Sequence, residues 1–395
     1  FGVRRILKGV RSGAITENDL NRAVGNLLEL IAKLRGEREP SKTWQTADFE
    51  TVSKKLALGS AVLLKNEQEL LPLPANADAA VIGMLAEKPH YQGAGSSLVN
   101  PLRVVSFLDA LREENLGWEY ARGYTLGARQ DPHLAEEAVE LAQRKGLVLF
   151  FAGLRDIDEA ESYDRLHMDL PAAQNSLIEK ITSVNQNVVV VLQSGSPVRL
   201  PWLAKVKAVL LVGLAGQMTG AASLDLLLGR ANPCGKLAET WAFAAEDAPS
   251  HSQFGGRFSN QYRESVFVGY RYYQTFQKAV CFPFGFGLSY TSFRVDNLEL
   301  NRSSLAPGED LEVSVRVINT GSRAGSEVIQ LYVSPPASAI FRPRMELKAF
   351  EKVVLAPGES QTVRLKLRHS DFAFWNTSLR AWHCEAGEYR LLVGT

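Results

Sequence analysis

The chain has 395 residues, enough for two or three domains of about 150 residues each. Its 46% hydrophobic and 22% charged residues are the balance of an ordinary globular protein with sizeable cores. A formal net charge of +1 favours neither nucleic acid nor anionic membranes as partners, and no apolar stretch approaches the roughly 18–20 residues that cross a bilayer.

The first 64 residues predict two helices and a linker. The chain starts with Phe1 and without a signal-peptide pattern, so we expect it to begin inside a longer protein that could carry its own localisation signal. Thr16 is a candidate helix cap, followed by apolar residues at helical spacing over 20–34. Residues 36–49 read as an exposed linker, and residues 49–64 as a second helix.

From about residue 77 the pattern changes to short apolar strands that alternate with helices. We expect strands at Ala79–Met84, Trp118–Tyr120, Leu147–Phe151, Val188–Leu192 and Ala208–Val212, and helices at Pro132–Lys145 and Pro171–Val184. Strands that are apolar along their whole length indicate a mostly parallel sheet covered on both faces. In such sheets, ligands bind at the carboxyl ends of the strands.

After residue 293 the pattern changes once more, to strands with polar and apolar residues in alternation. Leu311, Val313, Val315 and Val317 alternate with polar residues, and Ile329, Leu331 and Val333 do so again after the turn "NTGSRAG". Short alternating strands separated by Gly, Pro and Asn over about 100 residues are typical of a β-sandwich.

A cluster of acids directly follows the apolar run 147–151. Five carboxylates lie within residues 156–164, and a sixth is at Asp169. A solvated surface loop would explain them, but Asp164 and Arg165 could form an ion pair that orders the loop. An ordered acidic loop at the carboxyl end of a strand suits general acid chemistry, which needs a carboxyl held near its target.

Other motifs favour no cofactor. The glycines of "YQGAGSSLVNP" (91–101) lack the spacing of a dinucleotide fingerprint and predict a tight turn near a cleft. The six histidines have no metal-ligand spacing, and Ser194 to Ser196 form no nucleophile elbow. Residues 261–273 are aromatic and basic, and we expect a buried edge or an interdomain packing strip there. The three cysteines show no disulfide framework, which weakly favours a cytoplasmic location.

At this point the chain resembles glycoside hydrolase family 3, the β-glucosidase family, over essentially its full length. The resemblance rests on "AVLLKNEQELLPLP", "YQGAGSSLVNP", "ESYDRLHMDLPAAQNSLI", "NVVVVLQSGSPVRLPW", "GRANPCGKLAETW", "YRESVFVGYRYY", "FPFGFGLSYTSF", "NTGSRAGSEVIQLYVSPP" and "LKAFEKVVLAPGES", which follow one another in the family's order and spacing. It is strongest to bacterial β-glucosidases.

The resemblance implies three parts in a larger α/β protein. Residues 1–36 look like the end of a (β/α)8 barrel, and 37–64 like a linker and first helix. Residues 65–289 look like a mostly parallel α/β sandwich domain, and 290–395 like a fibronectin type III-like β-sandwich. The family's nucleophile, an aspartate, lies on the barrel, which also supplies most contacts to the sugar. Neither that aspartate nor the sugar-binding part of the barrel is in this chain.

The resemblance also assigns roles to residues. The family's acid/base is a glutamate just before a "G-aromatic-Asp-Arg" stretch, which here is Ser162 to Arg165 and gives the role to Glu161. A serine replaces the usual glycine and should stiffen the loop, and Glu159 is the alternative acid/base. Asp164 and Arg165 would order the loop. Candidate residues of the substrate cleft are Tyr91, Gln92, Gly93 and Ser96.

The implied function is a retaining β-glucosidase that releases terminal β-D-glucosyl residues from β-glucosides or oligosaccharides such as cellobiose, with no cofactor or metal and with the barrel half of the same protein as partner. β-Xylosidase and arabinosidase activities of the same family are alternatives. A non-catalytic carbohydrate-binding or scaffold fragment is a rival, and a nucleotide-dependent α/β protein ranks third. The sequence leaves homodimerisation open.

Overall fold

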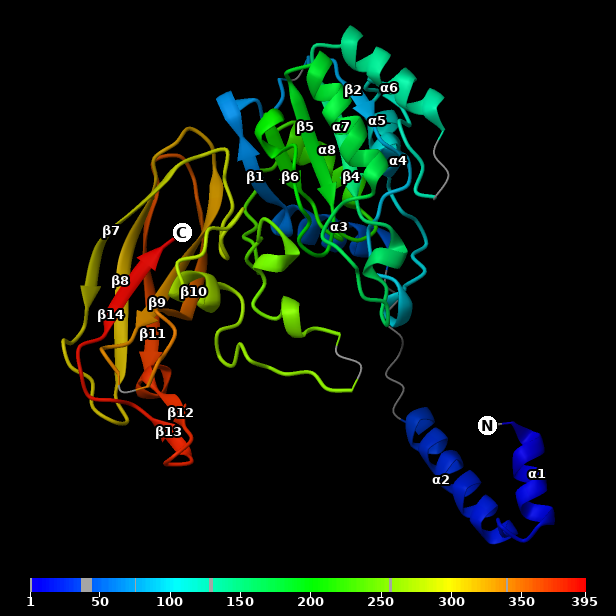
Figure 1. Cartoon of the computed structure of the whole chain (residues 1–395), viewed down its shortest axis with the longest axis vertical. Coiled ribbons are helices and arrows are strands. Elements are labelled where there is room, and N and C mark those ends of the chain that lie inside the picture. The colour runs from blue at the N-terminus through cyan, green and yellow to red at the C-terminus, as the bar shows by residue number, and fades with distance from the viewer. Residues whose placement is uncertain (1, 37–44, 75, 128–130, 256–257, 339) are drawn as a thin grey trace. The chain divides into compact units, whose positions relative to one another are not determined.

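The computed structural model describes residues 2–36, 45–74, 76–127, 131–255, 258–338 and 340–395. Its contacts divide the chain into two compact units, residues 1–49 and 50–395. Figure 1 shows the helices and strands of both units.

The first unit contains helices α1 (Val3–Arg11) and α2 (Glu17–Gly36). Thr16 caps α2 as predicted, because its Oγ1 accepts a hydrogen bond from Asp19 N at 3.1 Å. The Asp19 carboxylate accepts one in return from Thr16 N at 3.3 Å. The periodic leucines of α2 are exposed, including Leu27, Leu28 and Leu34. Most of the predicted linker, residues 37–44, lies outside the described residues.

The second unit begins with a six-stranded sheet in the order β1-β6-β5-β4-β2-β3. Its strands are β1 (Val62–Asn66), β2 (Ala80–Ile82), β3 (Glu119–Ala121), β4 (Val148–Gly153), β5 (Val188–Gln193) and β6 (Ala208–Leu211). The helices of this region are α3 (Thr46–Ser60), α4 (Met84–Glu87), α5 (Phe107–Glu113), α6 (Pro132–Arg144), α7 (Ala172–Val184), α8 (Thr219–Leu227) and α9 (Tyr270–Thr275). Five predicted strands and two predicted helices are confirmed within about three residues.

The prediction of one helix over residues 49–64 was wrong at its C-terminal end. Helix α3 stops at Ser60, and Val62 to Asn66 form the edge strand β1 instead. This strand pairs antiparallel with β6, with Val62 opposite Leu211. A short apolar run cannot be assigned to helix or strand from its periodicity alone. The sheet is therefore mostly parallel, as predicted, with one antiparallel edge.

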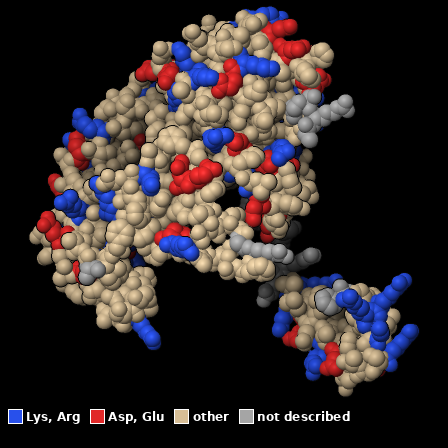
Figure 2. Space-filling model, in the orientation of Figure 1, with Lys and Arg blue, Asp and Glu red and all other residues tan. Residues whose placement is uncertain are grey.

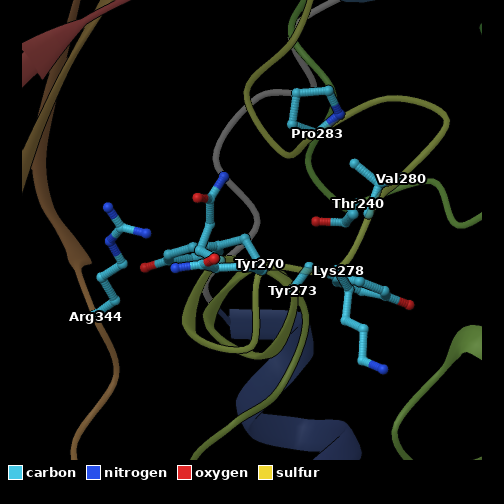
Figure 3. Close-up of a pocket in the computed structure, with 9 residues that line it drawn as sticks. Thr240, Tyr270, Tyr273, Lys278, Val280, Pro283 and Arg344 are labelled. Carbon is cyan, nitrogen blue, oxygen red and sulfur yellow. The ribbon is translucent and has the colours of Figure 1, made fainter.

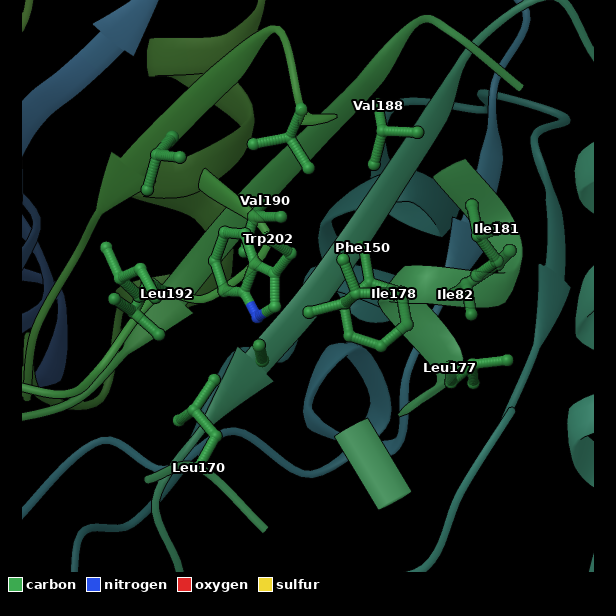
Figure 4. Close-up of a cluster of buried hydrophobic side chains, with 14 of the residues drawn as sticks. Ile82, Phe150, Leu170, Leu177, Ile178, Ile181, Val188, Val190, Leu192 and Trp202 are labelled. Carbon is green, nitrogen blue, oxygen red and sulfur yellow. The ribbon is translucent and has the colours of Figure 1, made fainter. Parts of the chain in front are cut away.

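The central strands are buried on both faces, so neighbouring residues along one strand belong to different cores. Phe150 lies in the core beneath α6 and α7, whereas Phe151 lies in the core beneath α5 and α8. Figure 4 shows the first core, in which Phe150 lies near Ile178 of α7. Trp202 is fully buried there, and its indole Nε1 donates to Asn175 Oδ1 at 2.8 Å. Such two-sided burial explains why these strands are apolar throughout.

The strand order reverses between β2 and β4. After β2, helices α4 and α5 pack on one face of the sheet, and α7, which follows β4, covers the other face. Because β2 and β4 are adjacent and parallel, the loops at their carboxyl ends start side by side and then separate. Open α/β sheets bind ligands in the crevice at this kind of switch point.

The C-terminal part is a β-sandwich, as predicted. Its sheets have the orders β10-β9-β14 and β11-β8-β7, with a separate β12-β13 pair. The strands are β7 (Phe293–Leu300), β8 (Asp310–Asn319), β9 (Gly325–Ser334), β10 (Glu346–Leu355), β11 (Ser360–Arg368), β12 (Phe374–Asn376), β13 (Ala381–His383) and β14 (Arg390–Gly394). The alternating residues of β8 and β9 that the sequence singled out are all buried between the sheets.

Polar and aromatic contacts join the β-sandwich to the α/β region. Lys236 Nζ lies 2.7 Å from the Glu327 carboxylate, and both side chains are largely buried. Tyr270 of α9 stacks on Phe284, and its hydroxyl accepts a hydrogen bond from Leu347 N at 2.8 Å. The predicted packing strip is thus confirmed for its C-terminal half, whereas Tyr262 in its first half is 82% exposed.

The visible surface carries mixed charge. Lys and Arg side chains are interspersed with Asp and Glu on the face in Figure 2, which agrees with the small net charge. Within the described residues, no helix combines the length and the apolar character that a membrane span requires.

Gln174 provides a test of this fold at the point where β4 ends. Its fully buried side chain accepts a hydrogen bond from Gly153 N at 2.9 Å and donates one to Gly153 O at 3.0 Å. Gln174→Leu leaves both backbone groups without these partners, so we expect a loss of about 2–4 kcal/mol in the free energy of unfolding. Denaturant titration measures this loss. The same substitution at the exposed Gln186 is the control and should stay within about 0.5 kcal/mol of the parent.

Candidate active site

The acidic loop after β4 is ordered by specific contacts. It begins with a 3-10 turn, Asp156–Glu159. Five of its six acids have a defined polar partner: Asp156 and Glu159 contact His90, Asp158 binds Arg155, Glu161 binds Ser96 and Asp169 binds Arg199. The loop is therefore not a freely solvated edge of the sheet.

Glu159 is the most enclosed of these acids. Its side chain is only 8% exposed. Oε2 lies 2.8 Å from His90 Nε2, while Oε1 accepts hydrogen bonds from Gly195 N at 2.9 Å and from Ser196 Oγ at 2.8 Å. All three partners come from loops at the carboxyl edge of the sheet. Glu159 thus ties the acidic loop to the loops that follow β2 and β5.

These contacts stabilise Glu159 as a carboxylate. Burial alone would raise its pKa, but the hydrogen bonds from His90, Ser196 and Gly195 N outweigh burial and hold the pKa below its usual value. A carboxylate whose oxygens already accept several hydrogen bonds is a poor proton donor. Glu159 is accordingly a structural anion in this arrangement.

Glu161 lies two residues further on and has a different environment. Its side chain is exposed, and its carboxylate accepts hydrogen bonds from Ser96 N at 3.1 Å and from Ser96 Oγ. The backbone around it pairs with the Gly-Ser loop, because Glu161 N donates to Ala94 O at 3.4 Å and Ala94 N donates to Glu159 O at 3.4 Å. Glu161 is therefore held in place while its carboxylate stays open to an incoming group.

Gly95 makes this close approach feasible. Its φ is +84°, in the left-handed region, and a Cβ built on it would lie 2.8 Å from Glu161 Cβ. Ser162, which follows Glu161, also has a positive φ of 73°. A non-glycine residue in this region carries backbone strain, so the loop is tightly constrained on both sides of the glutamate.

The other candidate residues of the cleft shape the Gly-Ser loop. Gln92 bridges it, donating to Val99 O at 3.0 Å and accepting from Val99 N at 3.0 Å. Tyr91 OH also accepts a hydrogen bond from Gln92 Nε2 at 3.0 Å. A Cβ at Gly93 would lie 3.1 Å from Ser97 Oγ. Of the four cleft candidates, Ser96 is the one whose side chain contacts Glu161.

The expected ion pair between Asp164 and Arg165 was wrong. Neighbouring side chains on this stretch point to different surroundings: Asp164 is exposed, and Arg165 Nη2 donates to Pro197 O at 2.9 Å. Within the part of the chain that the structure describes, no ion pair joins the two. Arg165 still links the acidic loop to the segment after β5, through a backbone carbonyl.

Sequence reasoning missed three contributors to this site. His90 was one of six histidines without metal spacing, and Gly195 and Ser196 were an ordinary strand-to-loop segment. Their shared position just beyond the carboxyl ends of β2 and β5 was the available signal. Glu239 is a further titratable group nearby: partial desolvation and the Glu159 charge raise its pKa, and Arg165 opposes that shift.

A separate cavity of about 270 Å³ lies between α9 and the segment before β10. In Figure 3, Tyr270, Tyr273 and Lys278 line it on one side and Arg344 on another. None of its lining residues belongs to the acidic loop. Among the described residues, no group of three or more His, Cys, Asp or Glu side chains is arranged to hold a metal ion.

The fold and the site together indicate the kind of chemistry that the α/β domain can support. An α/β domain with an open carboxylate at its switch point, followed by a β-sandwich, suits acid/base chemistry on a ligand bound at the carboxyl edge of the sheet.

The chain belongs to glycosyl hydrolase family 3. Residues 61–290 match the glycosyl hydrolase family 3 C-terminal domain, and residues 327–395 match the fibronectin type III-like domain. Both matches confirm the resemblance and the fold class that the sequence motifs indicated.

Known relatives match nearly the whole chain. Thermostable β-glucosidase B of Acetivibrio thermocellus is 41% identical over 99% of this chain and 52% of its own length. The exo-α-(1→6)-L-arabinopyranosidase of Bifidobacterium breve is 39% identical over 99% and 53%. The crystal structure of the Bifidobacterium adolescentis GH3 β-glucosidase superposes with a TM-score of 0.88 at 39% identity and covers 99% of this chain and 58% of that one. The chain thus spans about half the length of the curated relatives.

Gly95→Ala tests the contact between the Gly-Ser loop and Glu161. The added methyl group meets Glu161 Cβ, and alanine must also adopt a positive φ, so we expect a loss of about 1–3 kcal/mol in the free energy of unfolding. Gly308→Ala is the matched control, since Gly308 also has a positive φ, of 85°, and its new Cβ has no neighbour within 4 Å. Equal stability of the two variants in denaturant titration would show that the loops do not meet in solution.

Proposed function

We propose that this chain supplies the general acid/base of a retaining β-glucosidase, with Glu161 in that role. The nucleophile, an aspartate, belongs to a (β/α)8 barrel outside this chain. The substrate is a β-glucoside or an oligosaccharide with a terminal β-D-glucosyl residue, and no cofactor or metal takes part.

One observation carries the choice of Glu161 over Glu159. Both acids lie on the same short stretch, but Glu159 is enclosed and anchored by three partners, while Glu161 is exposed. An acid/base catalyst must reach the leaving-group oxygen and later a water molecule. The open carboxylate of Glu161 meets that requirement, and the enclosed carboxylate of Glu159 does not.

The steps assigned to this chain follow from retention. Protonated Glu161 gives its proton to the glycosidic oxygen while the barrel aspartate attacks the anomeric carbon and forms a glycosyl-enzyme intermediate. Glu161, now a carboxylate, takes a proton from water as that water displaces the aspartate. Ser96 donates hydrogen bonds to this carboxylate and orients it. The two carboxyls must be about 5–5.5 Å apart, so the acidic loop has to reach the barrel mouth.

The exposed apolar residues of α2 support a barrel partner. Leu27, Leu28 and Leu34 are 56%, 59% and 64% exposed although they recur at helical spacing. A helix with an apolar stripe normally buries it against another element. We assign residues 1–36 to the end of the barrel. The sequence predicted a linker and first helix over 37–64, but Val62 to Asn66 form β1 of the six-stranded sheet, so the domain that carries the acid/base begins with β1 and extends to residue 289. Residues 290–395 form the fibronectin type III-like domain.

The names of the relatives bear on the sugar at the cleavage site. A relative that is 41% identical is named a β-glucosidase, and one that is 39% identical an arabinopyranosidase. β-Glucosidase is the preferred activity, and β-xylosidase or arabinosidase activity is the alternative. Most sugar contacts come from the barrel, so this chain chiefly sets the proton transfer.

Glu161→Ala in the full-length protein tests the proposal. With an aryl β-glucoside that has a poor leaving group, we expect the turnover to fall by about 10²–10⁴-fold, because the leaving oxygen is no longer protonated. Glucosides of acidic phenols should be affected less in their first step. Added azide should restore part of the activity and yield a β-glucosyl azide, which product analysis by NMR identifies.

Two comparisons make this test decisive. Glu140→Ala, an exposed glutamate on α6, should leave turnover unchanged. If Glu159→Ala instead gives the leaving-group dependence and azide rescue while Glu161→Ala does not, the two roles are reversed. Absence of activity in the unmodified full-length protein toward glucosides, xylosides and arabinosides would favour a non-catalytic carbohydrate-binding fragment.

A further inference from the structure

His90 is buried, yet it contacts two carboxylates. The residue is 3% exposed. Its Nδ1 lies 3.0 Å from Asp156 Oδ1, and its Nε2 lies 2.8 Å from Glu159 Oε2. Carboxylates only accept hydrogen bonds, so both ring nitrogens must donate, and only the imidazolium form has two N–H groups. With both carboxyls ionised, the geometry therefore favours the imidazolium form of His90.

The groups around His90 are few and well defined. From the 3-10 turn, Asp156 and Glu159 face the ring, and the neighbouring Asp158 is paired with Arg155. From β5, Gln193 Oε1 accepts a hydrogen bond from His90 N at 2.7 Å and fixes the backbone. Arg165 and Glu239 lie farther out. The charge of Arg165 lowers the pKa of Glu239, and the charge of Glu159 raises it.

The segment that begins with His90 also holds Glu161. His90 clasps the start of the acidic loop at Asp156 and Glu159, while Ala94 pairs with the backbone on both sides of Ala160. Ser96 then binds the Glu161 carboxylate. The two segments, 90–96 and 156–161, are thus joined along their length, which links His90 to Glu161 through a short series of contacts.

We propose that His90, as an imidazolium shared by Asp156 and Glu159, is the positioning residue that holds the acidic loop where Glu161 transfers its proton. This inference rests on the proposed function of Glu161. Loss of the His90 proton turns one N–H into a lone pair that faces a carboxylate at hydrogen-bond distance, which loosens the loop without touching the reacting groups.

The pH dependence follows from the direction of the shifts. Burial lowers the pKa of His90, but the hydrogen bond and charge of Glu159 and the charge of Asp156 outweigh burial, so the pKa lies above its usual value of about 6.5. The stabilisation is therefore complete below about pH 6.5 and is lost as pH rises through the raised pKa. The pKa of Glu159 is lowered, so its effect appears at low pH. The stabilisation that the Glu159 carboxylate contributes is lost as pH falls below the usual range of a glutamate pKa.

Two substitutions at His90 in the full-length protein test the proposal. His90→Gln cannot carry the charge, and near pH 6 we expect the turnover of an aryl β-glucoside with a poor leaving group to fall about 10–100-fold with little change in KM. The decrease in turnover at high pH that loss of the His90 proton causes, which is the alkaline limb of the pH profile, should disappear. His90→Arg keeps a permanent charge and several donors, so it should restore much of the turnover and remove that limb as well. His133→Gln, on the surface of α6, is the control.

A milder variant covers the case in which His90 variants fail to fold. Asp156 is 84% exposed, so Asp156→Asn should fold normally and remove one of the two charges that favour the imidazolium. The alkaline limb of turnover should then move down by about half a pH unit. A limb that stays at the same pH in Asp156→Asn, or turnover in His90→Gln equal to the parent at every pH, would overturn the proposal.

A measurement that needs no activity separates this inference from the proposed function. In the folded protein, NMR of the His90 ring should show an imidazolium that deprotonates above about pH 6.5, and amide exchange of residues 156–162 should accelerate over the same range. If the protein hydrolyses no glycoside but these signals appear, the proposed function fails and the positioning contact stands. A neutral His90 ring at pH 6 would refute the positioning role whatever the enzyme does.

Discussion

The parallel pairing of β2 with β4 is the constraint on which the candidate site depends. Ile82 lies opposite Phe150 in this pairing, so the two strands end at the same edge of the sheet. The chain after β2 leads to one face and the chain after β4 to the other, which leaves room for the Gly-Ser loop and the acidic loop to meet. This reversal in strand order brings together the loops that carry His90, Ser96 and Glu161.

Hydrogen bonds and ion pairs give the acids of the loop different environments. Glu159 is fixed as a carboxylate by donors from two other loops, and Asp158 and Asp169 are paired with arginines. An enclosed anion is tolerated because each of its oxygens has donors. These contacts also hold the exposed carboxylate of Glu161 beside Ser96, which fits the acid/base role proposed for it.

The β-sandwich is attached to the α/β region by contacts that resist independent movement. The Lys236–Glu327 ion pair is largely buried, and Tyr270 binds the backbone at Leu347 while it stacks on Phe284. A buried pair tolerates the loss of either partner poorly. None of these junction residues belongs to the acidic loop, and no described side chain of the β-sandwich contacts Glu159 or Glu161.

The sequence by itself determined the strands, the two architectures and the family, because apolar runs, alternating strands and the motif around "ESYDRLHMDLP" are local patterns. It also led to Glu161 as the acid/base candidate, a role that stays a prediction. It failed at Val62 to Asn66, a short apolar run with no periodicity that separates helix from strand, and at Asp164 and Arg165, which form no ion pair among the described residues. Tertiary structure alone decided which acid is enclosed, because the donors to Glu159 come from His90 and from Gly195 and Ser196, far apart in sequence. Burial and long-range hydrogen bonds exist only after the sheet brings its loops together.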